Sequence, residues 1–447
     1  MTVKHVLKFF TVAAIAALPC ASALASPEVP GAPQSQPVAL VGGTVHPVSG
    51  PSISGGTVLF DGGRITHVGA KVDVPKGAKI VDCRGKHVYP GLIDADSELG
   101  LVEIASVRAT VDYAETGTIN PNVRAQTAFN PDSELIPVTR SNGVLTAMVA
   151  PTGGLLCGLG AVMRMDGWTW EEMTIRGESA LYVNWPQLIE SHTWRLEQSA
   201  PEERTRARVI EQLTQVFADA RAYTKLKKAR AEQGQPAPDY DARWDAMIPV
   251  LDGRTPLYVR ADDVRQIQSA VAFARREGVK LVIVGGYHAP ECAELLKAEN
   301  VPVILKGVNR LPRHRHDPYD APFTIAARLH AAGIKFCISA SDRMANARNL
   351  PYHAATAAAF GLPRDEALKS VTLNAAQVLG VGDQLGSLEV GKAATLIVTD
   401  GDPLEIATHV TSAYIDGREV DLSDRHKRLW EKYRQKYRQL DERQSSQ

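Results

Sequence analysis

The chain has 447 residues, with 50 basic and 50 acidic side chains and a formal net charge of zero at pH 7. This length is enough for an α/β barrel with an accessory domain. The balanced charge gives no field that would attract nucleic acid or an anionic membrane, which excludes a nucleic-acid role.

Residues 1–25 have the order of a secretory signal peptide. Lys4 and Lys8 precede an apolar run over 9–18, and Ala23-Leu24-Ala25 forms a small-residue cleavage site. We therefore expect a mature protein that begins at Ser26 and is exported to the periplasm. Lipidation at Cys20 is the weaker alternative, because a proline stands where a small residue is expected. After residue 25, no stretch reaches the roughly 20 apolar residues of a membrane-spanning helix.

Four cysteines remain beyond the signal segment, at positions 83, 157, 292 and 337. They are widely spaced and form no CxxC pair, which argues against a zinc knuckle or a dense disulfide framework. One disulfide is possible among them, and the spacing does not determine which two cysteines would pair.

Both ends of the mature chain are rich in short β-type runs. Residues 26–37 form a linker of Pro, Ser and Gly, after which 38–87 alternate such runs with Gly and Pro turns. Short β-type runs are found again over 384–422. We expect these two segments to share a sheet and to form a small composite β-sandwich domain.

Between them, residues 88–383 alternate continuous apolar runs with helical stretches. Such runs are typical of parallel strands buried on both faces, so the segment predicts a TIM-like (β/α)8 barrel, an α/β fold. A charged helical pattern interrupts it as an insertion over 199–250, with Ser199 and Glu202 as a capping box. The apolar runs lie at 144–149, 257–259, 281–284, 301–305 and 334–338.

Two further segments have recognisable patterns. Residues 423–447 predict a C-terminal helix with one apolar face, which we expect to dock on the barrel, with a partner or a membrane surface as alternatives. Residues 153–160 are glycine-rich but lack the ending of a phosphate-binding loop, so they predict a flexible loop over the barrel mouth. Cys157 within it has no nearby histidine to act as its base.

The strand over 88–94 reads Val-Tyr-Pro-Gly-Leu-Ile-Asp and would end at the mouth of the barrel. With the segments around it, this strand resembles the amidohydrolase superfamily, in its secreted, imidazolonepropionase-related branch. The supporting segments, in chain order, are 61–65, 129–133, 140–144, 342–346, 371–376 and 386–392. The resemblance implies a barrel whose metals lie at the carboxyl ends of the strands and activate water to attack an amide or related C–N bond.

The residues that this resemblance places at the metal site differ from the family pattern. The first strand of the family ends in HxH, and here Asp96-Ser97-Glu98 stands in its place. The histidine after the fifth strand falls on Arg260, and that after the sixth falls near 285–286, with His288 close by. Only the aspartate after the last strand, Asp342, stands as the family has it.

Two interpretations of this change stay open. Asp96, Glu98 and Asp342 offer an all-oxygen set for a hard divalent cation. Alternatively, Arg260 supplies the positive charge in place of a metal, and we favour this interpretation because converging carboxylates without a cation would repel one another.

Other polar residues follow predicted strands. His288 is a candidate ligand or general base, and equally a packed loop histidine. Lys306 is a candidate for binding a substrate carboxylate or for pairing with an acidic neighbour. His314 and His316 form a second HxH-like pair, but no strand precedes them to fix their geometry, so we do not expect a metal there.

The resulting hypothesis is an exported hydrolase that acts on a C–N bond of a small amide, cyclic amide or peptide-like molecule. Asp342 would activate water, Asp96 and Glu98 would hold a divalent cation or polarise the substrate, and Arg260 and Lys306 would bind it. The alternative is a catalytically inactive barrel that binds a ligand or serves as a structural subunit. Both hypotheses allow a homo-oligomer, or a hetero-oligomer with an active relative.

Overall fold

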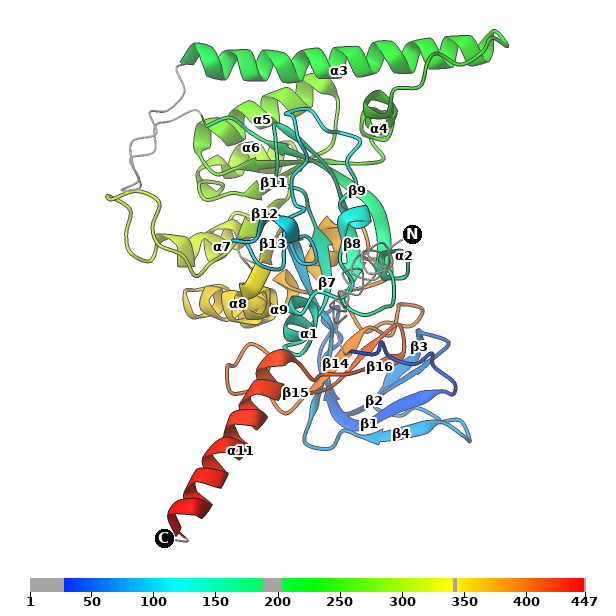
Figure 1. Ribbon diagram of the computed structural model, residues 1–447, viewed down its shortest axis with the longest axis vertical. Helices are drawn as coiled ribbons and strands as arrows, with labels where there is room; N and C mark the ends of the chain where they lie inside the picture. The colour runs from blue at the N-terminus through cyan, green and yellow to red at the C-terminus, as the bar shows by residue number, and fades with distance from the viewer. Residues whose placement is uncertain (1–27, 188–202, 341–343, 446–447) are drawn as a thin grey trace, which may run out of the picture.

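A computed structural model describes residues 28–187, 203–340 and 344–445 (Figure 1). The expected signal peptide, the capping box at Ser199 and the catalytic candidate Asp342 lie outside these residues. Within them the chain forms a barrel domain and a smaller sheet domain, which lies at the lower right of the view.

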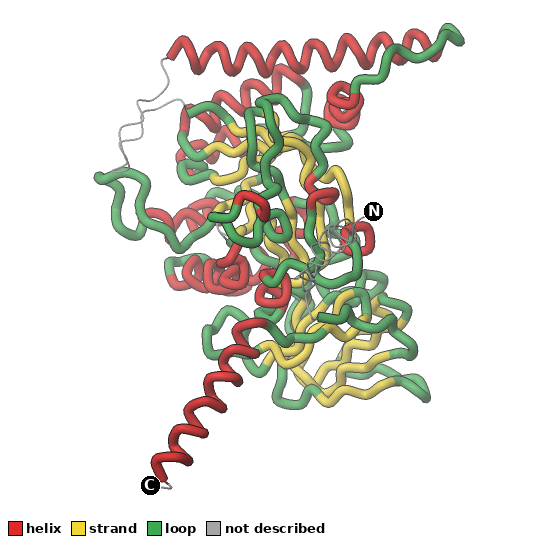
Figure 2. Tube along the Cα trace, viewed as in Figure 1, coloured by secondary structure: helices red, strands yellow, loops and turns green. Residues whose placement is uncertain are grey.

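The smaller domain is built from both ends of the chain, as predicted. Strand β14 pairs antiparallel with β5, which joins the C-terminal strands to the N-terminal ones in one sheet, drawn as the lower group of strands in Figure 2. Phe60 and Tyr414 meet edge to face in its core, with ring centroids 5.1 Å apart. The strands are β1 (Val38–Val45), β2 (Ile53–Asp61), β3 (Arg64–Gly69), β4 (Lys79–Asp82), β5 (His87–Pro90), β14 (Leu396–Thr399), β15 (Val410–Ile415) and β16 (Arg418–Val420).

The second sheet forms the barrel. Its order is β13-β12-β11-β10-β9-β8-β7-β6, and polar contacts link the two ends of that order: the Ser339 hydroxyl donates to the Asp96 carbonyl at 2.9 Å. This confirms the predicted TIM-like barrel. The strands are β6 (Leu92–Ser97), β7 (Val144–Val149), β8 (Leu156–Arg164), β9 (Thr174–Asn184), β10 (Leu257–Ala261), β11 (Leu281–Gly285), β12 (Val303–Lys306) and β13 (Phe336–Ser339).

Strand β8 departs from the regular barrel and corrects one expectation. It runs antiparallel to both β7 and β9, and it contains most of the glycine-rich segment that was expected to be a flexible loop. A Cβ at Gly160 would lie 2.7 Å from the Tyr182 ring, so glycine is needed there for close approach of the side chain rather than for mobility. Cys157 on this strand is buried, not accessible as the loop prediction implied.

Helices cover the barrel and form the insertion. The longest, α3, lies across the top of the view and packs on α5 through Phe217 and Phe273, whose ring centroids are 5.2 Å apart. The helices are α1 (Leu135–Arg140), α2 (Trp170–Met173), α3 (Glu203–Glu232), α4 (Ala242–Leu251), α5 (Val264–Glu277), α6 (Ala293–Ala298), α7 (Ala321–Ala331), α8 (Leu350–Ala359), α9 (Arg364–Ser370) and α10 (Leu373–Val378). Short 3-10 turns are η1 (Arg108–Thr110), η2 (Ala125–Ala128), η3 (Pro290–Cys292) and η4 (Met344–Asn349).

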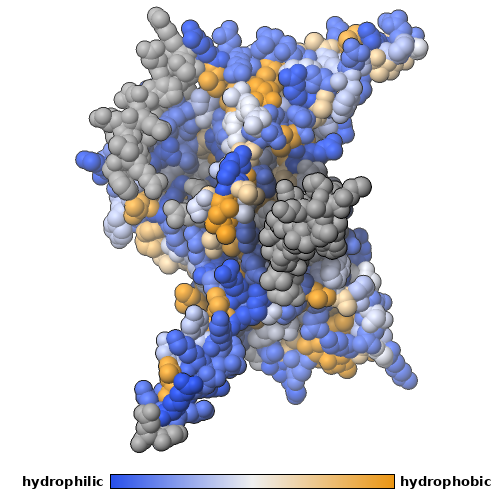
Figure 3. Space-filling model, in the orientation of Figure 1, coloured by the Kyte–Doolittle hydropathy of each residue, from blue (hydrophilic) through white to orange (hydrophobic). Residues whose placement is uncertain are grey.

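The C-terminal helix α11 (Arg425–Ser445) extends away from the body and buries no residue, so the expectation that it docks on the barrel is wrong (Figure 1). Its own basic side chains partly cover its rings: the Arg434 guanidinium lies 4.5 Å from the Trp430 ring centroid. The surface of α11 is accordingly mostly hydrophilic (Figure 3). Within the described ranges, no helix has the length and apolar character that crossing a bilayer requires.

Candidate active site

The mouth of the barrel is defined by three acidic residues on and after β6. Asp94 and Asp96 lie on the strand and Glu98 follows it directly, with a shift of the β6–β7 register between Asp94 and Ser97. Asp94 and Asp96 are buried, and Glu98 is partly exposed. The barrel therefore carries a row of carboxyl groups from its interior toward its opening.

Asp96 lies between two cations. The Lys306 ammonium at the end of β12 is 3.0 Å from Asp96 Oδ2, and Arg260 Nη2 on β10 is 3.5 Å from Asp96 Oδ1. Burial would raise the pKa of Asp96, but the charges of Lys306 and Arg260 outweigh burial and hold the pKa below its ordinary value. Asp96 is therefore a carboxylate at neutral pH, compensated by side chains of the protein itself.

Contacts with the neighbouring strands hold the Arg260 guanidinium in place. Its Nη1 donates to the Pro151 carbonyl at 2.9 Å and to Asn184 Oδ1 at 3.3 Å. Its centre lies 4.6 Å from the centroid of the Tyr182 ring, which packs beneath it. A guanidinium fixed on three sides presents its charge to the mouth in a set orientation.

Glu98 and both cations line one open cavity of about 450 Å³. Burial raises the pKa of Glu98, and the opposing charges of Lys306 and Arg260 do not cancel this effect. A carboxylate with a raised pKa is a stronger base than an ordinary one, which suits Glu98 to taking and returning a proton. The remaining lining residues include Thr152, Trp185, Gln187, Asp262, Gln266 and Arg313.

A second polar group lies at the rim of the same opening and was largely missed in the sequence. Arg313 Nη1 is 2.6 Å from Asp262 Oδ2, and Arg313 Nη2 is 3.4 Å from Asp263 Oδ2. His288 is turned toward Asp263, with its Nδ1 3.5 Å from Asp263 Oδ1. The available signal was the Asp262-Asp263 pair directly after β10, because barrel sites take their residues from such positions.

The side chains around Asp96 do not fit a divalent cation. Both Asp96 oxygens already have a cationic partner, and Arg260 offers no lone pair to a metal. Even two unit charges 4 Å apart repel by about 4 kcal/mol at an effective dielectric near 20, and a dication beside Lys306 and Arg260 would meet more than that. The structure thus brings together Asp96, Glu98, Arg260 and Lys306, whose catalytic and binding roles stay predictions, as does that of Asp342.

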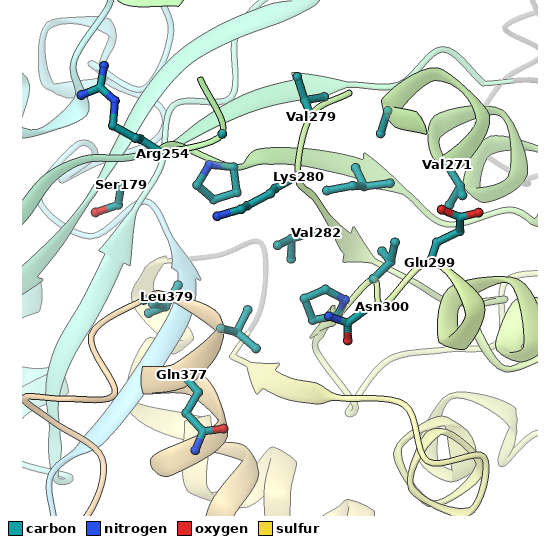
Figure 4. Close-up of a pocket in the computed structure, with 18 of the residues that line it drawn as sticks. Ser179, Arg254, Val271, Val279, Lys280, Val282, Glu299, Asn300, Gln377 and Leu379 are labelled. Carbon is teal, nitrogen blue, oxygen red and sulfur yellow. The ribbon is translucent and has the colours of Figure 1, made fainter. Parts of the chain in front are cut away.

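A larger cavity lies at the opposite end of the barrel, near the starts of β10 and β11 (Figure 4). Its volume is about 640 Å³, and Ser179, Lys280 and Gln377 are among its lining residues. Its charged lining residues include Arg254 and Lys280, and the acidic Glu299 is paired with Arg275 at 3.4 Å. Because barrel enzymes place their chemistry at the carboxyl ends of the strands, we assign the active site to the smaller cavity.

Asp94 gives a pH-dependent prediction for the barrel interior. Burial raises its pKa to about 7, while Asp94 Oδ1 accepts a hydrogen bond from the Ala340 amide at 3.1 Å. The folded state thus binds a proton that the unfolded state releases near pH 4, and this contribution to stability is lost as the pH rises toward 7.

In Asp94→Asn the amide oxygen keeps the acceptor but cannot ionise. We expect the difference in free energy of unfolding, variant minus wild type, to increase by up to about 1.4 kcal/mol per pH unit as the pH rises through this window. Urea titrations at several pH values measure the difference. Parallel pH profiles for the two proteins would contradict the raised pKa.

Comparisons with known proteins agree on one family. Residues 259–420 match the profile of the Amidohydrolase family. Amidohydrolase tasK of Hapsidospora irregularis is 26% identical over 81% of this chain and 39% of its own length, so the chain spans well under half of that relative. An imidazolonepropionase of Mesorhizobium japonicum is 26% identical over 77% of this chain and 86% of its own. The crystal structure of an amidohydrolase from Thermotoga maritima matches with a TM-score of 0.78 and 26% identity, over 86% of this chain and 99% of that one.

Proposed function

The chain belongs to the amidohydrolase superfamily, and on that premise we propose that it hydrolyses a C–N bond of a small amide or cyclic amide. In this proposal Lys306 and Arg260 supply the positive charge that the family resemblance assigns to a metal. The observation that carries the proposal is the placement of both cations on Asp96 at the mouth of the barrel.

The residues around the cavity are sufficient for the reaction. Glu98 takes a proton from water, the resulting hydroxide adds to the carbonyl carbon, the C–N bond breaks, and Glu98 returns the proton to the leaving nitrogen. Lys306 and Arg260 line the same cavity and stabilise the negative charge that develops on the carbonyl oxygen. Asp96 holds these two cations in position.

Basic side chains of the cavity offer hydrogen-bond donors to an anionic group of a substrate. Arg260, Lys306 and Arg313 line it together with the acidic Glu98 and Asp262. Relatives named imidazolonepropionase and N-substituted formamide deformylase are among the similar proteins. We therefore place small cyclic amides that carry a carboxylate first among the substrate classes, and N-substituted formamides second.

A screen of both substrate classes, with Glu98→Gln and Asp342→Asn compared against Glu171→Gln on the exposed face of α2, tests the proposal. We expect Glu98→Gln to lower kcat by about 10²–10⁴-fold, the range for loss of a general base. The Glu171→Gln control should match the wild type. An unchanged kcat in Glu98→Gln with a lost kcat in Asp342→Asn would move the base to Asp342 and overturn the role given to Glu98.

One observation favours a second candidate function. Because Asp96 compensates Lys306 and Arg260, these cations stabilise an oxyanion less than unpaired cations would, and the cavity therefore also suits a barrel that binds a small amide without hydrolysing it. Saturable binding of a carboxylate amide with no turnover in the same screen would select this candidate. We further propose export, on the pattern of residues 1–25, and N-terminal sequencing of the protein from the periplasmic fraction should read from Ser26.

A further inference from the structure

Three side chains with metal-binding atoms meet at the rim of the barrel, outside the group that surrounds Asp96. They are Asp263, His288 and His314, and one ligand atom from each lies within 4.8 Å of the others. We propose that they form a binding site for a divalent cation of the zinc type.

The three residues come from consecutive loops at the carboxyl ends of the barrel strands. Asp263 follows β10, His288 follows β11 and His314 follows β12. The rings of His288 and His314 stack with centroids 5.4 Å apart and an interplanar angle of 19°. Both imidazoles are therefore already side by side next to a buried carboxylate.

His288 Nδ1 has an unmet polar requirement. It is buried and makes no hydrogen bond within normal criteria among the described residues, and its contact with Asp263 Oδ1, at 3.5 Å, is a long ion-pair distance. Leaving a buried polar atom without a hydrogen bond is unfavourable. A cation between His288 and Asp263 would satisfy both atoms at once.

The surrounding residues hold the three ligands in place. The Tyr287 hydroxyl donates to Asp317 Oδ2 at 2.6 Å, and the His314 amide donates to the same oxygen at 2.9 Å. These two hydrogen bonds hold the loop that carries His314, for which the sequence predicts no preceding strand to fix its geometry. Arg313 occupies only Asp263 Oδ2, so that Oδ1 stays directed at His288, in contrast to Asp96, where both oxygens have cationic partners.

The donor set selects the kind of ion. Two imidazole nitrogens and one carboxylate oxygen suit zinc, which often keeps a fourth position for water, whereas calcium and magnesium prefer all-oxygen sites. In a tetrahedral zinc site the donors lie about 3.3 Å apart, so ligand atoms that now lie within 4.8 Å of one another would have to approach by up to about 1.5 Å, and His314 is the partly exposed ligand that comes from the loop after β12. His316 is outside the group, with an 84% exposed side chain, so the site uses only one histidine of the HxH-like pair.

Zinc binding to the full-length, chelator-stripped protein tests the site, using zinc alone as the probe. Zinc content is measured by mass spectrometry, affinity by competition with a chromophoric chelator, and ligand geometry by the visible spectrum of the cobalt-loaded protein. The variants are His288→Ala and His314→Ala, with His316→Ala as the control from the same loop. Asp96→Asn removes a carboxylate at the centre of the mouth, so it shows whether zinc binds there or at the rim.

We expect one ion in the wild type, His316→Ala and Asp96→Asn, and affinity at least about tenfold lower in His288→Ala and His314→Ala. A wild type without stoichiometric zinc, or equal affinity in all the histidine variants, would overturn the site. Zinc that is lost only in Asp96→Asn would place the ion at the centre of the mouth, which contradicts this site and the proposed chemistry together. Failure of the rim site alone leaves the role of Lys306 and Arg260 untouched.

Discussion

Replacing Lys306 by methionine is expected to lower the free energy of unfolding by about 3 kcal/mol, near the lower end of the range for breaking a buried ion pair, because Arg260 still faces Asp96. If the protein is the hydrolase proposed above, kcat should fall by roughly 10²–10³-fold as well, the effect of losing one oxyanion-stabilising donor. Urea unfolding and steady-state kinetics measure the two effects separately.

A double-mutant cycle with Asp96→Asn shows whether these losses come from the pair itself. The double variant should be more stable than the sum of the single changes predicts, by about 1–3 kcal/mol, because it leaves only Arg260 without its partner, whereas Asp96→Asn alone leaves both Lys306 and Arg260 without theirs. Wild-type Asp96 has a depressed pKa, so its stabilising contribution is present above its unfolded pKa and is lost as the pH falls. Additive losses in the cycle would show that Lys306 acts on something other than Asp96.

Replacing Arg140 is expected to lower the free energy of unfolding at least as much as replacing Lys306. Arg140 lies buried at the end of α1, where its guanidinium is 2.7 Å from Glu28 Oε2 and 3.1 Å from Asp166 Oδ1, and it donates to the Asp421 carbonyl at 2.9 Å. Because these contacts join the chain before β1, the barrel and the end of the sheet domain, Arg140→Met should destabilise the protein by about 3–5 kcal/mol. The free energy from urea unfolding is the measurement.

A surface ion pair supplies the control. Arg84 and Asp82 also lie within 2.6 Å of each other, but both side chains are exposed, so we expect Arg84→Met to leave the unfolding midpoint unchanged. If Arg140→Met also left the stability unchanged, the buried cluster of Arg140, Glu28 and Asp166 would not hold the two domains together. Unfolding of the variant in two separate transitions would show that the cluster couples them.

The sequence predicted the fold where local patterns and packing agree. Continuous apolar runs such as 144–149 and 281–284 are buried on both faces and became β7 and β11. Strand β8 was missed because glycines such as Gly160 indicate turns or loops when only the local sequence is considered. The reason for glycine here is the close approach of the Tyr182 ring, which exists only in the tertiary structure. The apolar face of α11 misled in the opposite direction, since its rings, such as the 63% exposed Trp430, stay at the surface of a helix that buries no residue.

The site was predictable where one strand specifies it. Asp96 and Glu98 share the register of β6, and Arg260 and Lys306 end their own strands, so strand position placed them at the mouth. The pairing of Lys306 with Asp96 joins residues far apart in the chain, and the sequence left that partner open. The meeting of Asp263, His288 and His314 depends on a loop fixed by Tyr287, which no local pattern shows.

The central claim is that protein cations at Asp96 replace a metal in the reaction. Its most direct test is kcat/KM of His314→Ala protein after chelation, with bound metal measured in the same sample and the rim site removed by the substitution. We predict hydrolysis within about threefold of the untreated variant, and loss of hydrolysis when Lys306→Met is added. Hydrolysis that appears only after addition of Zn²⁺ or Mn²⁺, and that disappears together with the bound ion in Asp96→Asn, would contradict the claim.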